Sequence, residues 1–217
     1  MNFIQAALLG VIEGLTEFLP VSSTGHLILA ANLLGLPQTE FMKTFEIAIQ
    51  LGAILAVIWV YRRVLFTDFE ALKRVLAAFL PTAVIGLALY KFIKRFLFAG
   101  TSTVLWSLFL GGIVLILFDR WHRPKNSDVQ KTAEIPFLKA AAIGVAQSLS
   151  VVPGISRAAA SIVGALWLGT DRRTAVEFSF LLAVPTLVAA TALDLFKNAP
   201  LFDPSEWKLL LTGGVVS

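Results

Sequence analysis

The 217-residue chain is 57% hydrophobic and 15% charged, with a mean hydropathy of +0.81, which is far too apolar for a soluble globular domain. The formal net charge of +4 comes from basic residues scattered between apolar runs, which form no basic face and so exclude a nucleic-acid-binding protein. Cysteine is absent, and this excludes disulfides, a thiolate nucleophile and a cysteine-ligated metal.

The apolar sequence divides into two broken helix pairs and several uninterrupted spans. In chain order we expect a broken pair over residues 4–34, spans over residues 45–61, 75–93 and 103–118, a second broken pair over residues 137–168, and a span over residues 175–195. A further span begins near Trp207 and is still apolar at Ser217. Each uninterrupted span has about the length that crosses the roughly 30 Å hydrocarbon core. The sequence therefore predicts an all-α polytopic membrane protein in the lipid bilayer.

Each broken pair consists of two helices separated by a polar elbow. The first elbow is residues 20–24 (PVSST), and the second elbow is residues 153–156 (PGIS). Proline starts each break, and Gly35 and Gly169 end the second helices. These second helices have about a dozen residues and rise about 18 Å, which is too short to cross, so both pairs are predicted to be re-entrant hairpins.

The two broken pairs resemble each other in sequence. Gly10 and Val11 match Gly144 and Val145, Glu13 matches Gln147, Pro20 matches Pro153, Ser23 matches Ser156, and Phe45 matches Phe178. Chance similarity between apolar segments is the alternative, and the matched breaks favour a true repeat. With the basic loops placed on the cytoplasmic side, the spans that follow the two pairs run in opposite directions, which predicts an inverted-topology repeat with a site near the midplane. We expect one membrane domain over residues 1–217, with repeat one at about 1–118 and repeat two, truncated at its C-terminus, at about 135–217.

Two carboxylates lie in the first broken pair, and ionisable residues inside membrane helices are candidates for function because they are costly there. Glu13 and Glu17 are four residues apart, so both side chains are predicted on one helix face. Two like charges so close repel each other, and a divalent cation between them and a substrate relieves the repulsion. We therefore predict a metal site at Glu13 and Glu17, with one protonated, structurally hydrogen-bonded carboxyl as the alternative.

Hydroxyl groups and a histidine follow these carboxylates. Ser22, Ser23 and Thr24 precede a helix, where serine and threonine usually act only as N-caps. His26 follows within one turn, and a histidine beside a hydroxyl and two carboxylates provides a nucleophile, a proton carrier and a metal site together. Ser23 and His26 are therefore candidate catalytic residues, whereas His122, in a basic loop, is predicted to be solvated.

The second elbow offers an anion-binding site. Ser156 and Arg157 open a helix, so backbone N–H groups, the positive end of the helix dipole and a guanidinium are predicted to converge on a phosphate. Gln147 and Ser161 are candidates for further polar contacts, and a buried arginine paired with a glutamate is the alternative. Together, these residue types are typical of phosphoryl transfer, and the apolar fold around them favours a lipid phosphate as the substrate.

Two stretches of the chain closely resemble signatures of the undecaprenyl-diphosphate phosphatase, or bacitracin-resistance, family. Residues 13–26 (EGLTEFLPVSSTGH) resemble the first signature, and residues 153–157 (PGISR) resemble the second. The resemblance implies a hydrolase of the bacterial inner membrane that removes a phosphate from undecaprenyl diphosphate in peptidoglycan synthesis. It also implies a divalent cation, Mg²⁺ or Ca²⁺, and an active site on the extracytoplasmic side, and it leaves a homodimer open.

The resemblance also implies site residues. The positions that match the family's functional residues are Glu13, Glu17, Ser23, His26 and Arg157. Ser23 is a proposed nucleophile, with His26 and an activated water as alternatives. Substrate contacts are expected from Ser22, Thr24, Gln147, Ser156, Arg157 and Ser161. Residues 158–161 (AAAS) depart from the Ser-Gly-Ala-Thr that is common in the family, so no hydroxyl directly follows the arginine.

Two other functions fit parts of this pattern. Inverted repeats with broken helices are typical of secondary carriers, and a transporter or flippase of a polyprenyl phosphate needs a similar anion site. Such a carrier uses Arg157 but has no evident use for Ser23. The unrelated lipid phosphatases with a histidine nucleophile place a histidine several residues beyond a Ser-Arg pair, and none follows Arg157 here.

Overall fold

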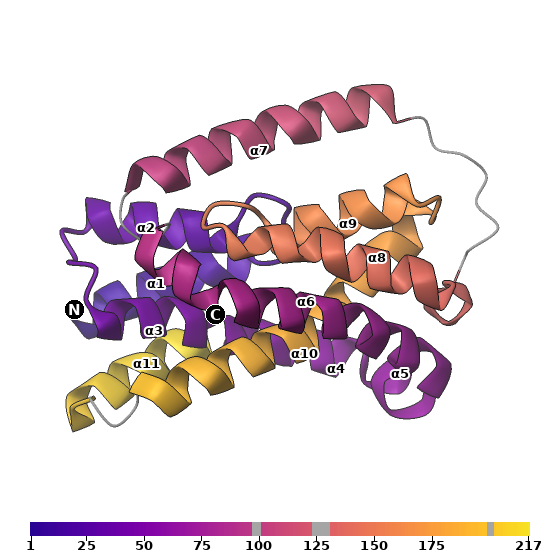
Figure 1. The fold of residues 1–217 in the computed structure, drawn as a ribbon. Coiled ribbons are helices and arrows are strands. Elements are labelled where there is room, and N and C mark those ends of the chain that lie inside the picture. Colours follow the sequence, from indigo (N-terminus) through magenta and orange to yellow (C-terminus); the bar gives the residue numbers. More distant parts are fainter. Residues whose placement is uncertain (97–100, 123–130, 199–201) are drawn as a thin grey trace.

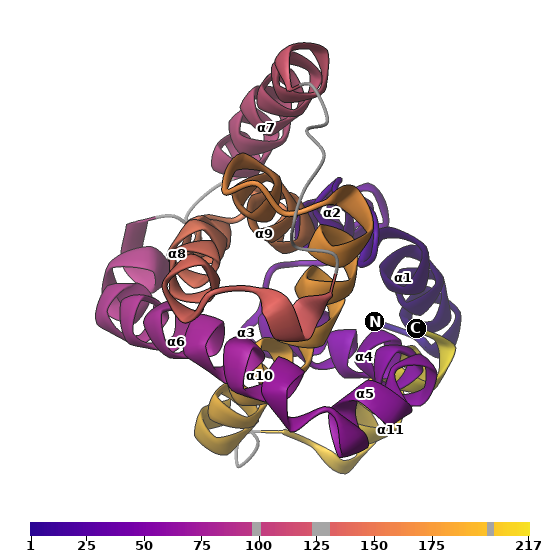
Figure 2. The same ribbon diagram turned by 90° about the vertical axis from the view of Figure 1, so that its right-hand side faces the viewer.

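The computed structural model describes residues 1–96, 101–122, 131–198 and 202–217, and every regular element in these ranges is helical. The α-helices are α1 (Phe3–Thr16), α2 (Ser23–Leu33), α3 (Glu40–Ala48), α4 (Gln50–Val60), α5 (Arg62–Thr67), α6 (Phe69–Phe96), α7 (Thr101–Trp121), α8 (Phe137–Gln147), α9 (Arg157–Trp167), α10 (Arg172–Asn198) and α11 (Pro204–Val216). Two short 3-10 helices, η1 (Thr132–Glu134) and η2 (Ser148–Val151), flank α8. Most helices form one bundle, and α7 lies along its outside in both views (Figures 1 and 2).

Four helical stretches within the described ranges are long and apolar enough to cross a membrane. They are Glu40–Val60, Phe69–Leu89, Ser102–Trp121 and Arg172–Asn198, and they confirm four of the five predicted spans. The further span predicted from Trp207 corresponds to α11, which begins at Pro204 and has 13 residues, too few to be among them. The first of them combines α3 and α4, which meet at Ile49. Only 6% of the apolar window in α7 is buried inside the protein, so its side chains face outward, as in a helix surrounded by lipid. The chain is thus a multi-pass, all-helical membrane protein.

Both predicted breaks are present, although the first helices of the pairs end earlier than predicted. α1 ends at Thr16 because the chain already turns before the proline of the first elbow, and α8 ends at Gln147 because its last turn tightens into η2. Gly35 and Gly169 end α2 and α9 with φ angles of 68° and 85°, the left-handed conformation expected there. Ser22 has a φ of 64° and is the one described non-glycine residue with a positive φ.

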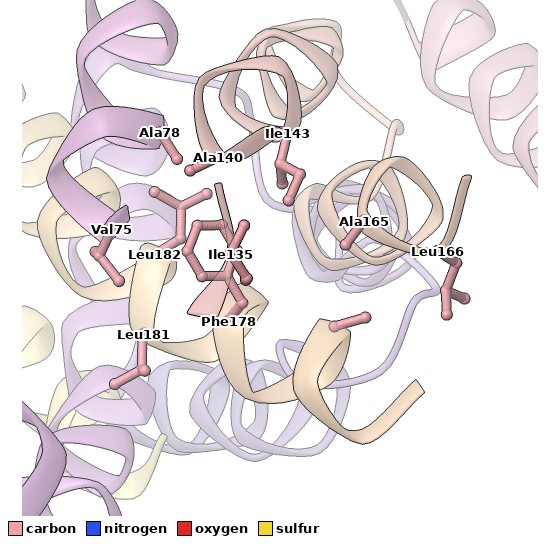
Figure 3. Close-up of a cluster of buried hydrophobic side chains, with 11 residues drawn as sticks. Val75, Ala78, Ile135, Ala140, Ile143, Ala165, Leu166, Phe178, Leu181 and Leu182 are labelled. Atoms are coloured by element: carbon pink, nitrogen blue, oxygen red, sulfur yellow. The ribbon is translucent and has the colours of Figure 1, made fainter. Parts of the chain in front are cut away.

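The second broken pair is held by an apolar core that it shares with α6 and α10. Figure 3 shows the ring of Phe178, from α10, beside Ile135 and Leu182, with Ile143 of α8 close by. Phe45, the match of Phe178 in the predicted repeat, is also fully buried, in a separate cluster formed by α1, α2, α3 and α11. Each cluster packs the helices of one elbow against the helix that follows that elbow in the chain.

Glycines allow some of these helices to pack at very short separations. A Cβ added at Gly144 in α8 would lie 1.9 Å from the backbone oxygen of Ala78 in α6. A Cβ added at Gly10 in α1 would lie 2.6 Å from the backbone oxygen of Gly213 in α11. Gly10 and Gly144 are matched positions of the predicted repeat, and α1 on α11 and α8 on α6 are major helix contacts of the fold. Small residues therefore set the separation of α1 from α11 and of α8 from α6.

Gly144→Ala is expected to destabilise the protein, because the added methyl group meets a backbone carbonyl of α6. We expect the unfolding free energy to fall by about 1–3 kcal/mol, seen as a lower midpoint of thermal unfolding in detergent micelles. Gly111→Ala in α7 is the matched control, since nothing lies within 4 Å of a Cβ at Gly111. Equal midpoints for the two variants would contradict this description of the packing.

Candidate active site

A cavity of about 560 Å³ lies where the two elbows meet. Its wall combines residues of both elbows with residues of α4, α6 and α10. The polar residues of the wall are Glu17, Ser22, Ser23, Thr24, Gln50, Thr82, Ser150, Ser156, Arg157, Thr186 and Asp194. The fold therefore brings the acidic, hydroxyl-bearing elbow and the arginine-bearing elbow into one space.

Glu17 joins a hydroxyl of the first elbow to the guanidinium that follows the second. Ser23 Oγ donates a hydrogen bond to Glu17 Oε2 over 2.5 Å, and Arg157 Nη2 donates to Glu17 Oε1 over 2.9 Å. Arg157 Nη1 donates to the backbone oxygen of Ser179 in α10 over 3.0 Å. The side chains of Glu17 and Arg157 are 6% and 9% exposed, so the ion pair is buried. This geometry fixes the guanidinium and places a carboxylate where it can accept the proton of Ser23.

Each helix that follows an elbow begins with a serine cap, although the cap of α2 is Ser22 and not Ser23, the residue matched with Ser156 in the predicted repeat. Ser22 Oγ accepts a hydrogen bond from Gly25 N over 3.4 Å, and Ser156 Oγ accepts one from Ala159 N over 3.1 Å. Other N–H groups in the first turns of α2 and α9 have no partner within their own helix. Because both capping serines line the cavity, both helix N-termini lie at it, and their dipoles favour an anion there.

His26 contacts the first elbow rather than the cavity. The backbone oxygen of Ser22 accepts hydrogen bonds from His26 N over 3.2 Å and from His26 Nδ1 over 2.9 Å. A carbonyl oxygen only accepts, so Nδ1 carries the hydrogen. Within the described part of the chain, the side chain of His26 is not part of the cavity wall, and the hydroxyl of Ser23 bonds to Glu17. The structure therefore places Glu17 beside Ser23, and the catalytic role of His26 stays a prediction.

Glu13 is completely buried, one helical turn before Glu17. Glu17 and Ser23 lie near its carboxyl group, but neither carboxylate oxygen forms a hydrogen bond of normal geometry among the described residues. An ionised carboxylate without a partner in a protein interior is strongly unfavourable, so Glu13 requires either a proton or a cation. Carboxylate oxygens are ligands that suit Mg²⁺ and Ca²⁺. Glu13 is not part of the cavity wall, however, so the metal site at Glu13 and Glu17 stays a prediction. The described ranges hold no group of three or more His, Cys, Asp or Glu side chains placed to bind metal.

Comparison of the sequence with known proteins identifies the family of the chain. A sequence model described as "Bacitracin resistance protein BacA" matches residues 6–217. The chain belongs to this family. It is 51% identical to the undecaprenyl-diphosphatase of a Sulfurihydrogenibium species over 217 aligned residues. The alignment covers 100% of this chain and 85% of the relative. The undecaprenyl-diphosphatases of Aquifex aeolicus and Thermus thermophilus are each 50% identical, covering 98% and 96% of this chain and 83% and 80% of the relatives. Membership confirms the resemblance seen in the two signatures.

Two predicted substrate-binding residues of this BacA-family chain lie outside the cavity wall. Gln147 is fully buried, and its Nε2 donates to Thr186 Oγ1 over 3.0 Å and to Thr82 Oγ1 over 3.4 Å. Thr82 and Thr186 line the cavity, so Gln147 is linked to it through them. Ser161 forms a hydrogen bond of 2.7 Å with Ser179 Oγ, at the contact of α9 and α10. The substrate contacts of Gln147 and Ser161 stay predictions.

The cavity also contains polar residues that the sequence alone did not single out. Gln50, Thr82, Thr186 and Asp194 line its wall, and Thr44 Oγ1 donates to Asp194 Oδ2 over 2.5 Å. Each of these residues interrupts an apolar span, which is the signal that could have drawn attention to them. Which of them face one cavity depends on how separate spans pack, and no single span carries that information.

Removal of the guanidinium is expected to destabilise the protein, independently of any effect on catalysis. In Arg157→Met, the Glu17 carboxylate stays buried without its cation, so we expect the unfolding free energy to fall by about 3–5 kcal/mol. In the double variant Glu17→Gln/Arg157→Met, a neutral amide replaces the unpaired charge, and stability should recover towards that of the wild type. Thermal unfolding in detergent measures both. A double variant as unstable as Arg157→Met would argue against a buried ion pair.

Proposed function

We propose that this chain is an undecaprenyl-diphosphatase, which hydrolyses undecaprenyl diphosphate to undecaprenyl phosphate and inorganic phosphate. The observation that carries this proposal is the Glu17 carboxylate, which contacts both the Ser23 hydroxyl and the Arg157 guanidinium at the cavity wall. A base, a hydroxyl and a phosphate-binding cation are groups that phosphoryl transfer uses. Relatives that are about half identical and named undecaprenyl-diphosphatase support the same reaction.

The cavity suits a substrate with a charged head and an apolar tail. Beyond the elbows, its wall continues along α6 and α10 through apolar side chains that include Phe79, Leu87, Leu187 and Leu193. A diphosphate at the N-termini of α2 and α9 leaves the attached prenyl chain against these side chains. This division of the wall supports a polyprenyl diphosphate over a soluble phosphate ester.

In the proposed reaction, Ser23 is the nucleophile and Glu17 is the general base. As Glu17 Oε2 takes the Ser23 proton, Ser23 Oγ bonds to the terminal phosphorus, and the bond from that phosphorus to the bridging oxygen breaks. The bonding electrons leave with undecaprenyl phosphate, and Arg157 stabilises the negative charge of the transferring group. Water then attacks the phosphoserine, Glu17 returns its proton to Ser23 Oγ as that bond breaks, and phosphate leaves with the oxygen and hydrogens of the water.

A divalent cation, Mg²⁺ or Ca²⁺, belongs to this proposal. When bound, it supplies positive charge that offsets the charge of the diphosphate. Glu13 and Glu17 would hold it, and Glu13 would be the main ligand, since its oxygens form no hydrogen bond of normal geometry among the described residues. Both oxygens of Glu17 are already engaged, by Ser23 and Arg157.

For the membrane arrangement, we propose two re-entrant hairpins related by an inverted-topology repeat. α2 and α9 have 11 residues each and rise about 17 Å, which supports the hairpins. The matched helix contacts and the buried pair Phe45 and Phe178 support the repeat. With the basic loops in the cytoplasm of a bacterium, the first residues of the spans in α6 and α10 lie on the cytoplasmic side. The cavity wall reaches Leu87 and Asp194, which lie near the other ends of these two spans. The cavity therefore opens towards the extracytoplasmic side of the inner membrane.

Ser23→Ala is expected to remove most of the phosphate release. We expect kcat for undecaprenyl diphosphate to fall at least about 100-fold, because the nucleophile is lost, while the protein stays folded with a free energy of unfolding lower by about 1–3 kcal/mol, since Glu17 loses a hydrogen-bond donor. Inorganic phosphate released by the purified protein in detergent is the readout. Ser148→Ala is the matched control, because Ser148 Oγ donates to the backbone oxygen of Val145 and lies outside the cavity wall.

Undiminished phosphate release by Ser23→Ala would reject the serine mechanism. Absence of release by the wild-type protein would instead favour the rival function, a transporter or flippase of a polyprenyl phosphate, for which an anion site is sufficient.

Chelation is expected to stop the reaction. Excess EDTA should abolish phosphate release, and Mg²⁺ or Ca²⁺ should restore it. Glu13→Gln should raise the cation concentration for half-maximal activity at least about tenfold, because it removes a carboxylate ligand. Ca²⁺ should also raise the midpoint of thermal unfolding of the wild type and not that of Glu13→Gln. Full activity in excess chelator would reject the cation.

A further inference from the structure

Gln50 is a buried amide in the middle of a membrane span. It opens α4 after the break at Ile49, whose backbone oxygen accepts a hydrogen bond from Ser217 Oγ over 2.6 Å. Gln50 is 6% exposed and lines the same cavity as Ser23 and Arg157. A polar side chain at membrane depth indicates a partner or a function. The reaction described above makes no use of this residue.

The amide of Gln50 fixes the direction of the Thr24 hydroxyl. Gln50 Nε2 donates a hydrogen bond to Thr24 Oγ1 over 3.2 Å. Since the amide engages a lone pair of that oxygen, the hydroxyl hydrogen points away from Gln50. Among the described residues, no acceptor is recorded for this hydrogen. Thr24 lines the cavity, so the hydrogen is available to an oxygen atom of a bound ligand.

The surroundings of Thr24 indicate the chemistry of that ligand. Thr24 lies in the first turn of α2, where the helix dipole favours a negative charge. The Arg157 guanidinium lines the same cavity, where its charge is paired with Glu17, so the α2 N-terminus and the Thr24 hydroxyl remain as donors to an anion. A phosphate oxygen is an anionic hydrogen-bond acceptor, and a hydroxyl whose oxygen is already engaged offers it a donor.

We propose that Gln50 is a positioning residue, which makes the Thr24 hydroxyl a dedicated donor to a phosphate oxygen of the bound diphosphate. This inference rests on the proposed function, because it concerns how the same site recognises its headgroup. Gln50 acts through Thr24 Oγ1 and does not itself touch the substrate. The arrangement favours a lipid whose headgroup accepts hydrogen bonds over one whose headgroup donates them.

A double-mutant cycle on ligand affinity tests this inference. The probe is a methylene-bridged analogue of farnesyl diphosphate, titrated calorimetrically into the purified protein in detergent micelles. Thr24→Val should raise Kd about tenfold or more, the usual effect of losing a hydrogen bond to a charged group. Gln50→Met, which keeps the length of the side chain and removes the donor, should raise Kd about threefold to tenfold. In the Thr24→Val background, Gln50→Met should change Kd less than about twofold.

The serine background provides the matched comparison. Thr24→Ser keeps a hydroxyl, so Gln50→Met should again raise Kd about threefold to tenfold in that background. The inference is overturned if Gln50→Met costs the same factor in the Thr24→Val background as in the wild type, because the amide would then act without the hydroxyl. An unchanged Kd for Gln50→Met in the wild-type or the Thr24→Ser background would overturn the inference as well. So would the absence of analogue binding by the wild type.

Hydrolysis is measured separately, so the two proposals fail independently. Absence of phosphate release from undecaprenyl diphosphate by the wild type would remove the hydrolase, while the affinity cycle still decides the role of Gln50. Additive effects in the cycle, with phosphate release intact, would remove only the role of Gln50.

Discussion

The buried ion pair between Glu17 and Arg157 is the contact on which the rest of the site depends. Charged side chains at membrane depth are tolerated when they are paired, and both partners here are almost completely buried. The pair joins the end of α1 to the start of α9 and connects residues 140 positions apart in the chain. Arg157 also holds the Ser179 carbonyl, which extends the link to α10. Both partners line the cavity, so this link lies in its wall, where the two elbows meet.

Much of the fold could be predicted, because breaks in apolar helices leave clear signals in a sequence. Gly35 and Gly169 adopt the left-handed conformation that the predicted helix ends require, and Phe45 and Phe178 are both fully buried as matched residues. The predicted ends of the two helices that precede the elbows were less accurate. α1 stops at Thr16, and residues 17–21 already form turns around Pro20.

The composition of the candidate site could be predicted, but several of its contacts could not. Residue types alone indicated that Glu17 and Ser23 share a site, and the two are hydrogen-bonded. They did not indicate whether Glu17 or His26 would face Ser23. The positive φ of Ser22 shapes an elbow in which His26 bonds to the Ser22 carbonyl and leaves Glu17 beside Ser23. Gln50 was missed because its place at the cavity depends on the packing of a separate span.

A structure of the protein in lipid, with a methylene-bridged analogue of undecaprenyl diphosphate bound, is the most direct test that the space between the elbows is the catalytic site. We expect the terminal phosphonate between Ser23 Oγ and the Arg157 guanidinium, with Glu17 beside both and the prenyl chain along α6 and α10. A headgroup bound elsewhere, with Arg157 far from Glu17 and Ser23, would contradict the proposed site.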